Sequence, residues 1–189
     1  MEFLDERIIE LRQKEKEKEY TTLETGIYVN RELVEFASEK LFDEQVEILL
    51  PTSFIDMPQA VAKVKYPSEY RPPIIKTSLD GTVNFTFNLF GILTEGSDGL
   101  EEVAAHFQLV LKQVNPILKI HNDDEAVCEG QPYRLFSYKS YGLDMQIYNL
   151  ICVTPIRDKV LQGSFSCPYE GHELWGGIAR QVFLSIRMK

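Results

Sequence analysis

Residues 74–90 read IIKTSLDGTVNFTFNLF, and they carry the clearest structural signal in the chain. From residue 83 to 89, apolar residues alternate with Asn and Thr, which is the period of a strand with one covered and one polar face. A second apolar run covers residues 74–78, and Asp80-Gly81 between the two runs is a strong hairpin signal. The stretch therefore predicts two antiparallel strands joined by a tight turn.

Further strand signals lie on both sides of this hairpin. Toward the C-terminus, residues 133–139, 143–154 and 159–165 predict a three-stranded meander. The middle segment becomes apolar on both faces toward its end, as a central strand does. Toward the N-terminus, short strands are expected at residues 26–30 and within residues 33–50. Together these segments predict an antiparallel sheet of about six strands.

Two long helices are expected to pack on this sheet. Asp98 with Glu101 resembles a capping box, and a helical apolar stripe follows until Pro116. That stripe consists of Leu100, Val103, Ala104, Phe107, Val110, Leu111 and Val114. A terminal helix opens near Pro168, with a stripe made of Trp175, Ile178, Ala179, Val182, Phe183 and Ile186.

Adjacent glycines, Gly176 and Gly177, interrupt the terminal helix. Each costs roughly 1 kcal/mol against Ala within a helix, so we expect close backbone packing at this point. A brief helical turn is also expected at residues 58–64.

The N-terminal segment predicts one more helix, over residues 2–19. Its stripe of Leu4, Ile8 and Leu11 lasts two to three turns before KEKEKE takes over. This helix either docks at its front and is solvated behind, or serves as a partner-binding arm. We therefore expect an N-terminal helical arm at residues 1–20 and a single α+β domain at residues 21–189, with helices flanking an antiparallel sheet.

Composition narrows the range of partners. The chain has 189 residues and a net charge of −9, and its Lys-rich stretch alternates with Glu, so we expect no nucleic-acid partner. The three cysteines, Cys128, Cys152 and Cys167, are far apart and are interpreted as buried apolar residues in a reducing compartment. Without a signal peptide or a membrane-length apolar run, a cytoplasmic location without membrane insertion is expected.

The usual patterns of catalytic and metal sites do not occur in the sequence. Gly163–Cys167 lacks the second Gly of a nucleophile elbow. The histidines, His106, His121 and His172, have no metal-ligand spacing, and the acidic run His121–Glu125 is interpreted as a solvated turn. No phosphate-binding glycine motif is found. We therefore predict no catalytic residue, no cofactor and no metal, and the chain is not expected to be an enzyme.

The best candidate for a binding surface is an aromatic loop with an arginine. Tyr66, Tyr70 and Arg71 cluster there with two prolines, and aromatic and Arg side chains are enriched at interface hot spots. Alternatively, Tyr–Pro packing pins this irregular connector to the sheet. The polar face of the strand at Asn84 and Thr86 could also receive a ligand, or could lie beneath the edge of a helix.

Several of these segments resemble the PsbP-like superfamily. The strand end Gly163–Pro168, followed by a helix with Trp175 that finishes at Phe183–Arg187, is similar to the end of those proteins. Leu49–Phe54 and the Tyr-Pro loop at Lys65–Pro67 are similar to their entry strand and following loop.

The resemblance covers about residues 40–188, and the superfamily includes DcrB-type proteins, Mog-type Ran-binding factors and Eag chaperones of type VI secretion. It implies an α/β/α sandwich. It also implies a non-enzymatic role in binding other proteins or the hydrophobic segments of partners.

Three hypotheses follow. The first is a non-catalytic binding or adaptor protein that works on another protein, with a chaperone or immunity-like factor of a secretion or toxin locus as one subclass. The second is an enzyme or small-ligand binder whose pocket is assembled from dispersed residues around Tyr66, Arg71 and Asn84. The third is a homodimer formed through the terminal helix or the N-terminal arm.

Overall fold

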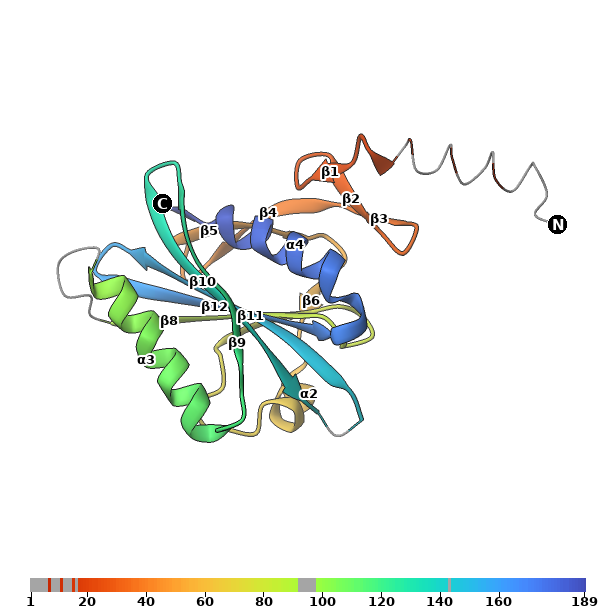
Figure 1. Ribbon diagram of the computed structural model, residues 1–189. Coiled ribbons are helices and arrows are strands. Elements are labelled where there is room, and N and C mark those ends of the chain that lie inside the picture. The colour runs from red at the N-terminus through yellow and green to blue at the C-terminus, as the bar shows by residue number, and fades with distance from the viewer. Residues whose placement is uncertain (1–6, 8–10, 12–14, 16, 92–97, 143) are drawn as a thin grey trace.

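The computed structural model describes residues 7, 11, 15, 17–91, 98–142 and 144–189 (Figure 1). Its main sheet has seven strands in the order β6-β7-β8-β12-β11-β10-β9, each antiparallel to its neighbours. These strands are β6 (Ile55–Asp56), β7 (Ile74–Thr77), β8 (Asn84–Gly91), β9 (Ile120–Cys128), β10 (Gln131–Tyr141), β11 (Gln146–Ile156) and β12 (Lys159–Pro168). The predicted hairpin is β7–β8, and the predicted meander is β10–β12.

The prediction of about six strands is wrong, because β6 is not expected from the sequence and the edge strand β9 is expected there as a turn. His121–Glu125 lie within this edge strand, whose side chains are mostly exposed and polar. Asp123 and Glu125 pair with Arg134 of β10, whereas Asp124 pairs with Arg180 at 3.0 Å. Backbone pairing and ion pairs thus hold β9 in place. Neither interaction requires apolar residues, so the sequence shows no alternation of apolar and polar residues in this strand.

Two smaller sheets complete the β structure. The first has the order β1-β2-β3, from β1 (Thr21–Thr22), β2 (Gly26–Val29) and β3 (Glu32–Val34). The second has the order β13-β5-β4, from β4 (Phe36–Leu41), β5 (Val46–Pro51) and β13 (Arg187–Met188). The strands expected within residues 26–50 therefore exist, but they pair outside the main sheet.

The helices are α2 (Gln59–Lys65), α3 (Asp98–Val114) and α4 (His172–Leu184), with a short 3-10 turn, η1 (Tyr169–Gly171), before α4. Leu135 packs in the α4 cluster and its neighbour Phe136 in the α3 cluster. Since successive strand residues point to opposite faces, α3 and α4 cover opposite sides of the sheet (Figure 1). Among the described residues, no helix is both long enough and apolar enough to cross a bilayer.

The two predicted helical stripes differ in how far they are buried. Ile178, Ala179, Val182 and Phe183 of α4 are buried as expected. In α3 the stripe packs on the sheet as far as Leu111, except that Val110 is 40% exposed, and Val114 at the end of the helix is 83% exposed. The helix predicted over residues 2–19 lies mostly outside the described residues, so the arm stays a prediction.

Helix α4 packs closely on β12 at Gly163. A Cβ atom on Gly163 would lie 2.5 Å from Cε1 of Phe183, whose ring is fully buried. Phe85 and Phe87 pack edge-on against the same ring, with centroids 5.8 and 6.4 Å away. A side chain at position 163 would therefore have to displace the Phe183 ring, which the close-packed surroundings resist.

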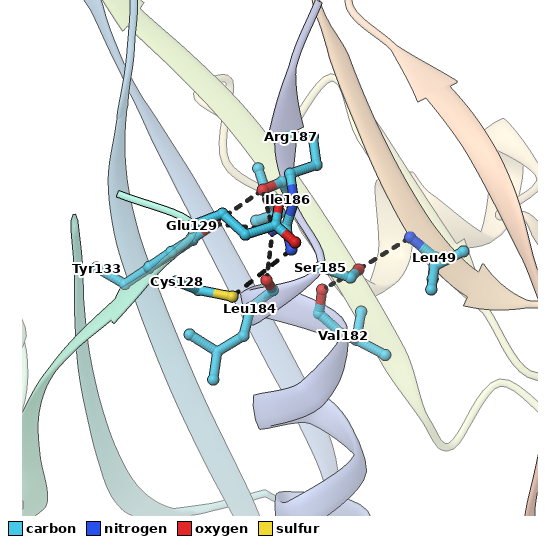
Figure 2. A network of polar contacts seen from close by, with 9 residues as sticks. All are labelled: Leu49, Cys128, Glu129, Tyr133, Val182, Leu184, Ser185, Ile186 and Arg187. Atoms are coloured by element: carbon cyan, nitrogen blue, oxygen red, sulfur yellow. Dashed lines mark hydrogen bonds and ion pairs between the residues drawn. The ribbon is translucent and has the colours of Figure 1, made fainter. Parts of the chain in front are cut away.

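A polar network anchors the end of α4 (Figure 2). Arg187 pairs with Glu129 at 2.7 Å and donates to the carbonyls of Leu184 and Ile186 at 2.7 and 2.9 Å. Tyr133 donates to the Ile186 carbonyl at 2.8 Å.

On the other side of the network, the backbone N–H of Leu49 donates to Ser185 Oγ at 3.0 Å. The network therefore joins the β9–β10 turn, the end of α4 and β5.

The glycine contacts predict opposite effects of the same substitution. We expect Gly163→Ala to lower the free energy of unfolding by about 1–3 kcal/mol, because the methyl group overpacks the Phe183 ring. Gly177→Ala should instead raise it by up to about 1 kcal/mol, because a Cβ at this α4 position meets nothing within 4 Å. Urea unfolding measures both values, and an unchanged or stabilised Gly163→Ala variant would contradict the packing described.

The buried hydroxyl of Tyr133 predicts a dependence of stability on pH. Burial raises its pKa to about 12, whereas an unfolded tyrosine has a pKa of about 10. The folded state holds this proton more tightly, so its contribution is complete below about pH 10 and is lost as the pH rises toward 12. We expect the free energy of unfolding to fall across this window in the wild type and to fall less in Tyr133→Phe. Tyr70→Phe, at a highly exposed site, is the matched control and should keep the wild-type slope.

Candidate functional site

The loop predicted as a contact patch divides into two parts. Tyr66 packs in a small cluster with Met57, Ala62 and Ile75, and burial raises the pKa of its hydroxyl. Arg71 Nε donates to the Tyr66 carbonyl at 2.7 Å. These contacts favour the second interpretation of the loop, in which Tyr66 and its neighbours pin the connector to the sheet. Tyr70, in contrast, is 93% exposed and is the loop residue that is free to meet a partner.

The pocket hypothesised around Tyr66, Arg71 and Asn84 does not form at Asn84. That side chain is 1% exposed, accepts from Thr77 Oγ1 at 2.9 Å and donates to the carbonyls of Gly81 and Thr82. Its polar atoms therefore serve the β7–β8 turn. Tyr66, Arg71 and Asn84 line none of the five surface hollows that we describe.

Two of the three cysteines lie in the core as expected, whereas Cys128 is only partly buried. Cys152 and Cys167 are buried, and burial raises the pKa of both thiols, that of Cys167 to about 12. Both thiols therefore stay protonated near neutral pH and are poor nucleophiles. Within the residues that the structure describes, no cluster of His, Cys, Asp and Glu could hold a metal ion.

The surface is hollowed mainly around the start of α4. Four of the five hollows border residues 168–177, which form the end of β12, η1 and the first turns of α4. The largest has a volume of about 830 Å³ and lies between the β2–β3 hairpin, the β7–β8 turn and α4. We call it the α4 groove. Its lining includes Val29, Glu32, Val34, Phe54, Leu79, Asp80, Val83, Glu170, Glu173, Leu174 and Trp175.

The wall of the groove contains two partly buried aromatic rings. Phe54 and Trp175 lie with ring centroids 6.0 Å apart, and Phe54 packs in turn on the core residue Phe85 at 5.9 Å. Leu79 stands at the tip of the β7–β8 turn and is 79% exposed. Because this leucine and the two aromatic rings line the same hollow, the groove has apolar surface that water covers in the free protein.

The turn that carries Leu79 is held by short polar contacts. Asp80 accepts from Ser78 Oγ at 2.5 Å and from the backbone N–H of Thr82 at 3.0 Å, and these hydrogen bonds lower the pKa of Asp80. Gly81 adopts a φ of 74°, which glycine tolerates without strain. Because the turn is braced, Leu79 is presented to solvent in a defined position.

The charge of the groove has one sign. Glu32, Asp80, Glu170 and Glu173 line it, and no Lys or Arg does so among the residues that the structure describes. Asp80 has a cation nearby, because Lys65 donates to the carbonyl of Gly81 at 2.6 Å. Within the described part of the chain, the other three carboxylates take part in none of the ion pairs found.

Sequence reasoning did not find this groove, because its residues come from positions 29 to 175. The available signal was Leu79, an apolar residue directly before the Asp80-Gly81 turn, where a polar residue is usual. The acidic residues gave no signal of their own, since each is a single Asp or Glu among many.

Comparison with known proteins identifies the fold. No family model matches the sequence, and a search of curated proteins finds no significant match. Among solved structures, cyanobacterial PsbP from Synechocystis superposes with a TM-score of 0.63 at 14% identity, over 87% of this chain and 98% of that protein.

Two other similar structures come from distant organisms. The Ran-binding protein Mog1p of Saccharomyces cerevisiae gives a TM-score of 0.54 at 11% identity, over 82% of this chain and 96% of that one. LpqN of Mycobacterium tuberculosis, which is involved in cell envelope biogenesis, gives 0.53 at 11% identity, over 90% and 98%. The chain therefore has the PsbP-like fold, which confirms the resemblance seen in the sequence.

Substitutions at the neighbouring residues Tyr70 and Arg71 should have different effects on stability, because only Arg71 is hydrogen-bonded to the loop backbone through its side chain. We expect Arg71→Ala to lower the free energy of unfolding by about 1 kcal/mol, because the Tyr66 carbonyl loses its charged donor. Tyr70→Ala should change it by less than about 0.5 kcal/mol, because the side chain is exposed. Urea unfolding of both variants checks this, and a larger cost for Tyr70→Ala than for Arg71→Ala would contradict the placement of the loop.

Proposed function

We propose that this PsbP-like protein is a non-catalytic binding protein that acts on another protein, and that the α4 groove is its contact surface. The observation that carries the proposal is Leu79, an exposed apolar side chain on a braced turn that lines the same hollow as the rings of Phe54 and Trp175. Leaving such a side chain exposed costs free energy that binding recovers, and apolar and aromatic groups provide most of the energy of protein interfaces.

The similar structures support a protein partner at the level of the fold. Mog1p is a Ran-binding protein, and Ran is itself a protein. At 11% identity this likeness does not extend to residues of this chain, so the groove rests on its own geometry.

The shape of the groove favours a protein segment over a small molecule. Small-molecule sites enclose about 70–90% of their ligand. Here Leu79 is 79% and Leu174 is 41% exposed, so a small ligand between them would keep much of its own surface in water. A chain segment of a partner can extend past both side chains and cover them.

Two narrower statements belong to the same proposal. A chaperone or immunity-like factor of a secretion or toxin locus is the subclass that the PsbP-like resemblance favours. The protein acts in the cytoplasm in this proposal, because three free cysteines suit a reducing compartment that keeps thiols unpaired.

A photo-crosslinking amino acid placed at position 79 tests the proposal in cells that express the protein. We expect Leu79→p-benzoylphenylalanine to give one recurrent adduct, because the partner covers this side chain. The same substitution at Val127, an exposed apolar position on β9 outside the groove, is the matched control and should give no such adduct.

Mass spectrometry then identifies the peptide joined to each position. Equal yields from the two positions, or no adduct from position 79, would count against the groove as the contact surface. An adduct with a second copy of this chain would replace the proposed partner with a homodimer.

A further inference from the structure

We infer that the occupant of the α4 groove is a cationic, linear segment of the partner protein that inserts one large apolar side chain. This inference rests on the proposed function, and it adds the chemistry of the segment that binds. It follows from two properties of the groove, namely the single sign of its charge and the position of its apolar wall.

The charge of the groove selects against anions. Glu32 contributes from β3, Asp80 from the β7–β8 turn, and Glu170 and Glu173 from η1 and the first turn of α4. These carboxylates border one hollow, and Lys65 beside the β7–β8 turn offsets the charge of Asp80. The remaining negative charge attracts a segment with Lys or Arg side chains, whereas it repels an acidic segment or a phosphate group.

The helix end does not reverse this selection. The N-terminus of an α-helix carries a partial positive charge of about half an elementary charge. In α4 that end already has Glu173 in its first turn, and Glu170 precedes it in η1. Two full negative charges outweigh the partial positive one, so the entrance to the groove stays acidic.

The same reasoning argues against occupants from this protein itself. Residues 1–19 contain seven acidic and five basic residues, and the whole chain has a net charge of −9. Neither the N-terminal segment nor a second copy therefore offers the positive charge that the groove favours. A partner of opposite charge also gains from long-range attraction, which raises its rate of association.

The apolar wall requires an anchor side chain. Phe54 and Trp175 face the hollow while their far sides pack on the core through Phe85 and Phe165. Leu79 lies on the side of the groove formed by the β7–β8 turn, and Leu174 lies on the side formed by α4. Both side chains are exposed. An aromatic or large aliphatic side chain that enters between them covers all of these surfaces, and the flanking basic residues then reach the carboxylates.

Trp175 makes the test direct, because it is the only tryptophan in the chain and it lines the groove. The probes are four short synthetic peptides without tryptophan. The first alternates Lys with Gly around one central Phe, the second replaces Lys with Glu, the third replaces Lys with Ser, and the fourth replaces Phe with Gly. We expect the first peptide to shift the emission of Trp175 saturably, and the other three to bind at least tenfold more weakly.

Two sets of variants separate the groove from the overall charge of the protein. In Glu32→Gln/Glu170→Gln/Glu173→Gln we expect the dissociation constant of the first peptide to rise about tenfold, the sum of three exposed charge pairs. The control, Glu24→Gln/Glu69→Gln/Glu101→Gln, makes the same change in net charge at exposed sites outside the groove. It should leave the dissociation constant nearly unchanged, and circular dichroism checks that both sets fold.

The outcomes distinguish this inference from the function on which it rests. Preference for the Glu peptide, equal binding of the peptide without Phe, or no response of Trp175 to any peptide would overturn the cationic, anchored segment. Equal weakening by the two sets of variants would overturn the groove carboxylates as its selective element. The crosslinks from position 79 test the binding function separately, since they depend on no assumption about the charge of the partner.

Discussion

The phenyl ring of Phe183 lies against the backbone of Gly163, and this contact sets how closely α4 approaches the sheet. The ring also meets Phe85 and Phe87, so one side chain joins the helix to the two central strands β8 and β12. Trp175 lies eight residues earlier on the same helix, on the stripe that faces the core. The position of the groove wall therefore depends on an interaction more than two helical turns away.

The two ends of α4 have different physical roles. At its C-terminal end, Arg187, Tyr133 and Ser185 tie the chain to β5 and to the β9–β10 turn, and their polar atoms are satisfied within the protein (Figure 2). At its N-terminal end, acidic and apolar side chains face solvent without such partners among the described residues. A firmly anchored helix that presents solvent-exposed groups at one end suits recognition, because a rigid element holds the contact groups in place before binding.

The parts of the fold that were predictable from the sequence are those with a regular apolar period. The alternation in β8 gave a correct strand, although its polar residues Asn84 and Thr86 are buried along with its apolar ones. The stripe of α4 gave a correct helix and a correct buried face, and the core segments of the PsbP-like resemblance led to the right fold. Strand β9 was missed because ion pairs of Asp123, Asp124 and Glu125 replace an apolar face there. Val114 was placed on a buried stripe because periodicity cannot show where the partner surface of a helix ends.

The sequence by itself determined the α+β class, the hairpin at Asp80-Gly81, the helix that covers the sheet and the acidic character of the chain, because each depends on local pattern or on composition. Only the tertiary structure decided that Arg71 and Asn84 serve the protein's own backbone, and that Leu79, Trp175 and Glu32 border one groove. Such a groove is a relation between segments far apart along the chain. Its members come together only when Gly163 and Phe183 have brought α4 onto the sheet, so no local pattern encodes it.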